Sequence, residues 1–150
     1  MEEKIKVSAG LIFDEFNNFL LSTRPSGKIF AGYWELAGGK LERGESFKTA
    51  LIRECKEELG IEIGALKFFG EFFHSYPHAK VQLQIFIAEK ENWSGKIKAK
   101  EGQKFLWLNL DNLEQDLKIK NPSPLLPTTE KILKLLKARN QALKQTTANC

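Results

Sequence analysis

The chain has 150 residues, of which 42% are hydrophobic and 28% charged, and this balance fits one domain that buries about 70% of its unfolded surface and excludes a disordered chain. No apolar run approaches the ~18 residues of a membrane span, and the start, Met1-Glu2-Glu3-Lys4, lacks the apolar stretch of a signal peptide, so we expect a cytosolic protein without a membrane partner. The net charge of +4 comes from residues 121–150, where no aromatic residues interleave with the basic ones, and this argues against a nucleic-acid partner.

The first residues predict strands separated by turns. Residues 4–13, KIKVSAGLIF, predict one strand, and the turn residues Asn17-Asn18 lead into a second strand over 19–21. The chain is therefore expected to open with a hairpin. Residues 24–33 hold one proline and two glycines and predict a loop, and residues 33–36 predict a short extended piece that ends at a pair of glycines.

A helix over residues 47–59, FKTALIRECKEEL, is the clearest element of the chain. Ser46 is a suitable N-cap because its side chain can accept a hydrogen bond from the first helical turn. Gly60 stands where a left-handed residue commonly ends a helix.

The second half of the chain predicts further strands and a last helix. Residues 61–73 and 81–88 predict strands, the latter through the alternation VQLQIFI, and residues 105–108 predict another. Thr128 or Thr129 can cap the last helix. Its inward-facing residues are expected to be Ile132, Leu133, Leu135 and Leu136.

This order of elements predicts the fold class. Strands, one helix, more strands and a final helix imply a mixed β-sheet between helices, which is an α/β/α sandwich. We expect a single domain over residues 1–145, a frayed tail over 146–150, and a monomer.

Three carboxylates of the predicted helix occupy unusual positions. On a helical wheel Glu54, Glu57 and Glu58 border the apolar stripe instead of the solvated side. They also place like charges at i,i+4 near the negative end of the helix, which a helix built for stability alone would avoid. One interpretation is a hard divalent cation, with magnesium as the natural candidate. The other is a surface helix whose glutamates pair with Arg53 and Lys56, and this geometry leaves both open.

A glycine-rich segment precedes the helix. Gly38-Gly39 is followed by Lys40, and Gly44 precedes Glu45. We expect a loop here that brings backbone groups close to a ligand and supplies a cation for phosphate.

Taken together, the glycine-rich segment and the helix resemble the signature of the Nudix hydrolase family. Gly39 is followed after five residues by Glu45, and after seven more by residues 53–61, RECKEELGI. The resemblance implies hydrolysis of a nucleoside diphosphate linked to another group, with a divalent cation bound on the helix. That cation would be Mg²⁺, with Mn²⁺ as an alternative.

The resemblance also implies residue roles. Glu54, Glu57 and Glu58 would be the catalytic acidic cluster for metal and water, and the Gly39 carbonyl oxygen would be an additional metal ligand. Glu45 and Arg53 would form a structural salt bridge between the loop and the helix. The chemistry is consistent, since attack of water on a polyphosphate needs cations to neutralise charge and a base to take a proton.

Similarity extends to the MutT branch of the family, which hydrolyses 8-oxo-dGTP to the monophosphate and pyrophosphate. The matching segments are Thr23-Arg24-Pro25, Trp34-Glu35-Leu36, Lys100-Glu101-Gly102-Gln103 and Leu126-Pro127. They imply that Glu101 reaches the metal from a loop, that Arg24 lies in the nucleotide site, and that Lys40 faces phosphate. The base would lie against Leu36.

Two positions depart from the MutT pattern. Ala37 replaces a proline before the double glycine, and Thr129 stands where MutT has an asparagine that recognises the purine. Threonine offers one hydroxyl, whereas asparagine offers both a donor and an acceptor. The alternatives are therefore a different nucleoside diphosphate-linked substrate, such as a dinucleoside polyphosphate or a nucleotide sugar, and a catalytically silent binding module.

Overall fold

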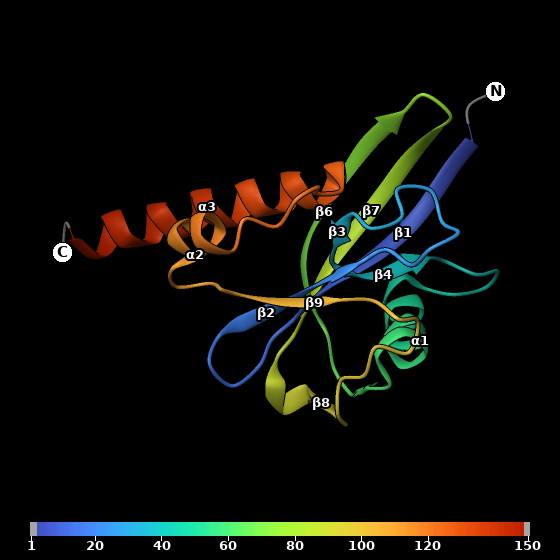
Figure 1. The fold of residues 1–150 in the computed structure, drawn as a ribbon, viewed down its shortest axis with the longest axis horizontal. Coiled ribbons are helices and arrows are strands. Elements are labelled where there is room, and N and C mark those ends of the chain that lie inside the picture. The colour runs from blue at the N-terminus through green and yellow to red at the C-terminus, as the bar shows by residue number, and fades with distance from the viewer. Residues whose placement is uncertain (1–2, 149–150) are drawn as a thin grey trace.

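The computed structural model describes the backbone of residues 3–148 and the side chains of residues 4–142. Its main sheet has four strands in the order β4-β1-β7-β6 (Figure 1). Strand β1 (Glu3–Ile12) is antiparallel to β4 (Ala37–Lys40) and parallel to β7 (Ala79–Ala88). Strand β6 (Lys67–Tyr76) is antiparallel to β7, so the sheet is mixed, as predicted.

Two smaller sheets complete the strand content of the described residues. In one, β2 (Asn18–Thr23) lies between β3 (Trp34–Glu35) and β9 (Phe105–Asn109). In the other, β5 (Glu62–Ile63) pairs with β8 (Trp93–Ser94), which follows the short 3-10 helix η1 (Lys90–Asn92).

The predicted opening hairpin is wrong. The turn exists, and an isolated bridge joins Phe13 to Phe19, but β1 and β2 belong to different sheets. Both edges of β1 are already occupied by β4 and β7, so no edge remains for β2. The sequence pattern of a strand does not show which strands it pairs with when both partners are distant in sequence.

Helix α1 (Phe47–Leu59) confirms the predicted bounds and caps. The Ser46 side chain accepts a hydrogen bond from the backbone of Thr49, and the Thr49 side chain accepts one from the backbone of Ser46. Gly60 ends the helix with a left-handed φ of 73°. A residue with a Cβ adopts this conformation only at a cost, which explains the glycine.

The glycine-rich segment and residues 61–73 differ from their predictions. Gly38 and Gly39 lie inside strand β4 and pair with β1, where a loop was expected. Residues 61–73 form no continuous strand, because the chain leaves β5 after Ile63 and enters β6 only at Lys67. An irregularity between Phe68 and Gly70 further interrupts the pairing of β6.

The C-terminal helices also differ from their predictions. Helix α2 (Leu113–Lys120) was not predicted, since it is short and contributes one buried residue, Leu113. Helix α3 (Pro127–Ala148) begins at a proline instead of after a threonine cap, because proline suits the first helical position. Leu135 is 47% exposed, whereas its three predicted inward-facing partners are buried.

The limits of the predicted domain and tail stay predictions. The backbone of α3 continues through Thr146 to Ala148. Residues 149–150 of the predicted tail lie outside the described residues. Within the described part of the chain, no helix has an apolar stretch of the length that a membrane crossing requires.

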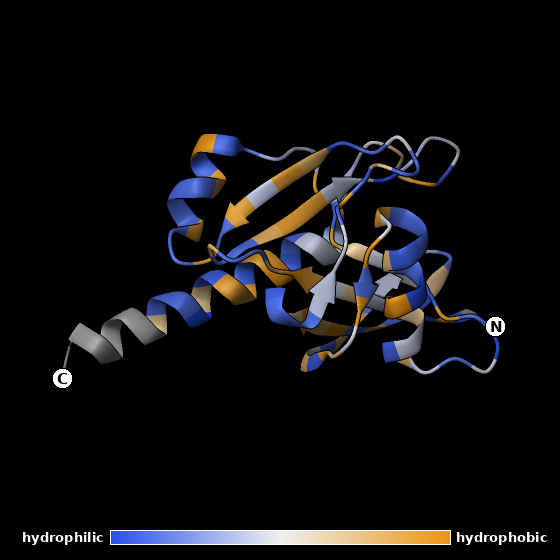
Figure 2. Ribbon diagram, turned by 90° about the horizontal axis from the view of Figure 1, so that it is seen from below, coloured by the Kyte–Doolittle hydropathy of each residue, from blue (hydrophilic) through white to orange (hydrophobic). Residues whose placement is uncertain are grey.

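Two hydrophobic cores on opposite faces of the sheets confirm the sandwich. Alternate residues of β1 separate, so that Ala9 and Leu11 join one core and Ile12 joins the other. The first core contains buried residues of α2 and α3, and the second contains those of α1. Figure 2 shows hydrophobic residues concentrated in the strands between these helices.

Candidate active site

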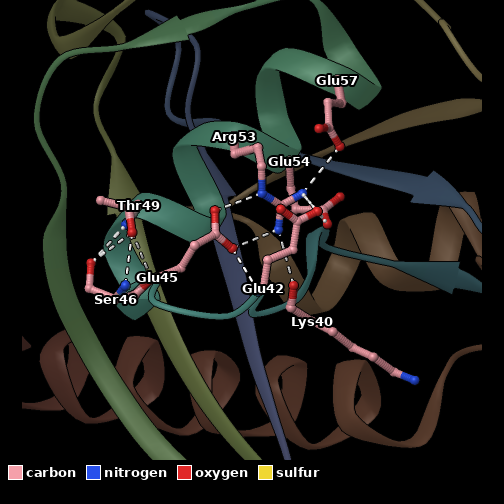
Figure 3. Close-up of polar contacts among 8 residues, drawn as sticks. All are labelled: Lys40, Glu42, Glu45, Ser46, Thr49, Arg53, Glu54 and Glu57. Carbon is pink, nitrogen blue, oxygen red and sulfur yellow. Dashed lines mark hydrogen bonds and ion pairs between the residues drawn. The ribbon is translucent and has the colours of Figure 1, made fainter.

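Arg53 of α1 joins the helix to the segment that follows β4 (Figure 3). Its Nε lies 2.7 Å from Oε2 of Glu45, and its Nη2 lies 2.9 Å from Oε1 of the same carboxylate. Nη2 also donates to the carbonyl oxygen of Lys40 at 3.1 Å. The hydrogen bond from Arg53 is the main reason that the pKa of Glu45 is lowered. The structure thus brings together the two residues of the predicted salt bridge.

Arg53 also contacts the acidic cluster, as expected from the interpretation in which glutamates of this helix pair with Arg53. Its Nη1 lies 3.0 Å from Oε1 of Glu54 and 3.2 Å from Oε2 of Glu57. The Glu57 side chain is 57% exposed, whereas that of Glu54 is only 16% exposed. Lys56 points elsewhere and pairs with Glu62 at 3.0 Å. The Arg53 guanidinium therefore neutralises part of the negative charge of Glu54 and Glu57 on this edge of α1.

Glu58 is the buried member of the cluster. Burial raises its pKa to about 9, and a hydrogen bond with Glu54 and the charges of Glu54, Glu35 and Glu101 act in the same direction. Water is excluded from this carboxyl group, and a second carboxylate adjoins it. A bound cation would stabilise both carboxyl groups in their ionised form, because it would remove the repulsion between them.

The glycines of β4 make room for this cluster. A Cβ on Gly39 would lie 2.7 Å from both Cδ and Oε1 of Glu54, so any side chain there would push the Glu54 carboxyl group out of its position. Gly38 has a φ of 146°, and a Cβ there would lie 2.0 Å from the carbonyl oxygen of Ser8. Glu54 therefore lies directly over the strand backbone at Gly39, as the expected close approach of this segment requires.

The turn after residue 98 carries Glu101 to the same place. Gln103 Nε2 donates to the carbonyl oxygen of Glu58 at 2.9 Å, and the Gln103 side-chain oxygen accepts from the Glu101 backbone at 2.9 Å. The charge of Glu101 raises the pKa of both Glu58 and Glu35. This turn therefore packs on the C-terminal end of α1 and brings a further carboxylate within electrostatic range.

The donors at this edge suit a hard cation, although they do not surround one point. Among residues whose side chains are described, no three His, Cys, Asp or Glu groups are arranged closely enough to hold a metal ion as they stand. Glu57 is turned toward Arg53 (Figure 3). Glu54, Glu58 and the adjoining backbone of Gly39 nevertheless offer oxygen ligands only, which is the donor set that Mg²⁺ and Mn²⁺ prefer.

A cavity of about 480 Å³ adjoins the acidic cluster. It is enclosed by strands of the main sheet, the loop after β2 and the start of α3. Glu54 lines it at one side, so the cluster and the cavity are continuous. The other predicted site residues in its wall are Arg24, Leu36, Gly39, Lys40 and Thr129.

One wall of the cavity carries a half-buried ion pair. Arg24 Nη1 lies 2.8 Å from Oε1 of Glu35, and Arg24 Nε donates to the carbonyl oxygen of Ile29 at 2.8 Å. Burial raises the pKa of Glu35, and the charge and hydrogen bond of Arg24 partly offset the increase. The sequence interpretation gave Glu35 no role beyond its place in the matching segment Trp34-Glu35-Leu36.

Aromatic rings form another part of the cavity wall. Tyr76 lies 6.1 Å from Phe30 and 5.6 Å from His78 between ring centroids, and the Tyr76 and His78 rings are stacked. Thr128 makes a hydrogen bond with Tyr76, and the adjacent Thr129 is only 2% exposed. A planar ring can stack on such a surface, and the buried hydroxyls can orient it.

Comparisons with known proteins agree with this geometry. Residues 4–129 match the model of the NUDIX domain. The chain is 33% identical over 101 residues to the 8-oxo-dGTP diphosphatase of Proteus vulgaris, which covers 67% of this chain and 88% of that protein. It is also 34% identical over 103 residues to the CTP pyrophosphohydrolase of Escherichia coli, covering 69% of this chain and 74% of that protein.

A solved structure shares the fold. The MutT protein from Methanosarcina mazei superimposes with a TM-score of 0.74 at 26% sequence identity. The match covers 93% of this chain and 96% of that structure. The arrangement of the sheets and helices is therefore shared along nearly the whole chain.

Proposed function

The chain belongs to the NUDIX family and is a MutT-like Nudix pyrophosphohydrolase, and from this premise we propose its substrate. It hydrolyses 8-oxo-dGTP or a related nucleoside triphosphate to the monophosphate and pyrophosphate, with Mg²⁺ or Mn²⁺ as cofactor. The observation that supports this most directly is the continuity of the two halves of the site. Glu54 belongs both to the acidic cluster and to the wall of a cavity large enough for a nucleotide.

The acidic edge of α1 holds the cofactor in this proposal. Glu54, Glu57, Glu58, the Gly39 carbonyl oxygen and Glu101 are its candidate ligands. When bound, the divalent cation neutralises charge on the phosphoryl group and assists ionisation of the attacking water. A carboxylate of the same cluster accepts the proton of that water as a general base. Because water is the nucleophile, no nucleophilic side chain is required.

The cavity binds the nucleotide. Lys40 stands at the exposed end of β4, next to the cluster, and supplies a positive charge for phosphate. The base lies against Leu36 and the aromatic wall, with Arg24 and Thr129 as its polar neighbours. The reacting phosphorus is thereby directed toward Glu54.

Glu45 and Arg53 have a structural role. Their paired hydrogen bonds fix the segment after β4 against α1, so the Gly39 backbone keeps its position under Glu54. The contacts of Arg53 with Glu54 and Glu57 balance those carboxylates whenever no cation does so.

Thr129 supports a second candidate, a pyrimidine nucleoside triphosphate. Its buried hydroxyl donates and accepts through the same oxygen atom. It therefore does not reproduce the two side-by-side contacts that an asparagine makes to a purine through separate oxygen and nitrogen atoms. The similarity to a CTP pyrophosphohydrolase is consistent with this alternative.

A product-resolved nucleotide screen tests both candidates. The full-length protein is incubated with Mg²⁺ and low concentrations of 8-oxo-dGTP, dGTP and CTP, together with a dinucleoside polyphosphate and a nucleotide sugar. We expect monophosphate and pyrophosphate from one triphosphate at a kcat/KM that exceeds the others by at least about 10-fold. Preferential hydrolysis of the dinucleoside polyphosphate or the nucleotide sugar would contradict the proposal, and Glu54→Gln controls for contaminating activity.

A further inference from the structure

Ser8 of β1 has no role in the function proposed above. Its side chain is fully buried, with 0% of its surface exposed. Among the described residues, its Oγ is the buried side-chain nitrogen or oxygen atom without a hydrogen-bond partner. A buried hydroxyl that makes no hydrogen bond has lost water without compensation. Such a group in a wall of a site calls for an explanation.

The register of β1 and β4 shows where Ser8 points. Ser8 lies directly opposite Gly39 in the antiparallel pair, and opposed residues project from the same face of a sheet. A Cβ on Gly39 would run into the Glu54 carboxyl group at 2.7 Å. Two residues along β1, a Cβ on Gly10 would meet Leu51 of α1 at 3.1 Å. Ser8 therefore projects toward α1, beneath the turn that carries Glu54.

The surroundings of Glu54 suggest what this hydroxyl is for. Ser8 and Glu54 line the same cavity. One Glu54 oxygen is held by Arg53 at 3.0 Å, and the carboxyl group also makes a hydrogen bond with Glu58. A carboxylate that ligates a metal is normally oriented by a further hydrogen bond from a neighbouring group. Ser8 Oγ is an uncommitted donor on the correct side of Glu54.

We propose that Ser8 is a positioning residue, whose hydroxyl donates a hydrogen bond to the Glu54 carboxylate when that carboxylate turns from Arg53 to a divalent cation. This inference rests on the proposed function, because it takes Glu54 as a cation ligand. In the metal-free protein the hydroxyl stays unpaired and lowers stability, because its lost hydration is not compensated. The residue therefore acts in the cation-bound protein alone.

Cation binding to the Ser8→Ala variant tests the proposal. Mg²⁺ and Mn²⁺ are titrated into the metal-free full-length protein by calorimetry, and melting is followed in parallel. We expect the Kd for either cation to rise about 10-fold, the size of effect seen when an orienting group behind a metal ligand is removed. The metal-free melting temperature should stay at or above that of the unaltered protein, because the variant lacks an unpaired buried hydroxyl.

Two further variants serve as controls. Ser75→Ala removes an exposed serine of β6 in the same sheet, and it should change neither Kd nor melting temperature. Ser8→Cys keeps the size and a weak donor, and its Kd should lie between those of Ser8→Ala and the unaltered protein. It also keeps the test valid if Ser8→Ala folds poorly.

The outcomes separate this inference from the function on which it rests. An unchanged cation Kd in Ser8→Ala, or a fall in metal-free stability alone, would make Ser8 a packing residue and overturn the inference. Weakened cation binding in Ser8→Ala would support the role of Ser8, whether or not the unaltered protein hydrolyses nucleotides. Absence of nucleotide hydrolysis by the unaltered protein would contradict the proposed function alone. A protein that bound neither Mg²⁺ nor Mn²⁺ would overturn both.

Discussion

At the scale of single residues, Glu54 connects the parts of the site. Its carboxyl group accepts a hydrogen bond from Arg53 and makes another with Glu58. The same group lies over the backbone of Gly39 and lines the cavity. These contacts all involve the carboxyl end of one side chain. A change that keeps the shape of this side chain and removes its charge therefore separates chemistry from packing.

We expect Glu54→Gln to lower kcat by at least about 100-fold while the fold stays intact, because the variant lacks a ligand or base that the transition state needs. Above pH 9, where Glu58 is ionised in the folded protein, its metal-free melting temperature should exceed that of the unaltered protein, since one of two adjoining carboxylates has lost its charge. Steady-state kinetics and circular dichroism melting curves measure the two effects. Near-normal turnover in a folded variant would remove Glu54 from the chemistry.

Thr129→Asn tests the base pocket. If Thr129 occupies the place of a purine-recognising asparagine, the variant gains a donor and acceptor pair and should favour 8-oxo-dGTP over dGTP by a further ~1–2 kcal/mol. The change should appear mainly in KM, because contacts to the base are shared by the ground and transition states. The ratio of kcat/KM for the two nucleotides is the measurement, and an unchanged ratio would place Thr129 outside the base pocket.

At the scale of elements, α1 and β4 form the frame of the site. Local signals predict α1 completely, because Ser46 and Gly60 fix its ends through hydrogen bonds within a few residues. The same signals fail for β4, whose glycines pair with β1 about thirty residues earlier in the chain. They also fail for the hydrogen bond from Arg53 to the carbonyl oxygen of Lys40, since that contact depends on how the segment after β4 packs against the helix.

Arg53→Ala tests the link between these two elements. The variant leaves Glu45 without its partner and frees the segment after β4, so melting temperature and turnover should fall together. Thermal unfolding and kcat/KM are measured on the same preparation. Arg53→Lys keeps the charge but not the forked geometry, so it should recover only part of either quantity. Native melting with normal kinetics in Arg53→Ala would rule out the structural role.

At the scale of the whole molecule, the two faces of the sandwich differ in composition. The face under α2 and α3 contains a continuous apolar core, whereas the face under α1 combines an apolar core with a buried carboxyl group. Patterns of apolar residues predicted packing on both faces of the sheet. They did not predict that the turn with Gln103 would be hydrogen-bonded to the backbone of Glu58, which lies about 45 residues earlier in the chain. A buried acid at this position couples the stability of the entire fold to pH and to cations.

The pH dependence of stability follows from Glu58. Its pKa is about 9 in the folded protein against an ordinary value of 4.5. Below pH 4.5 Glu58 is protonated in both the folded and the unfolded protein, so it does not change the free energy of unfolding as pH varies. Between 4.5 and 9 the unfolded chain loses this proton while the folded protein retains it, so the metal-free protein should lose stability as pH rises through this window. Above pH 9 the effect should level off.

A bound cation should reverse this trend, because its ligands must be deprotonated and binding therefore strengthens as pH rises. We expect the increase in melting temperature on adding saturating Mg²⁺ to be small near pH 5 and to grow toward pH 9. Glu54→Gln should flatten the metal-free profile, since the hydrogen bond and charge of Glu54 both contribute to the raised pKa of Glu58. Melting curves at several pH values, with EDTA or with Mg²⁺, measure both trends. A metal-free stability that rises between pH 5 and 9 would show that Glu58 is ionised throughout and is better solvated than its burial indicates.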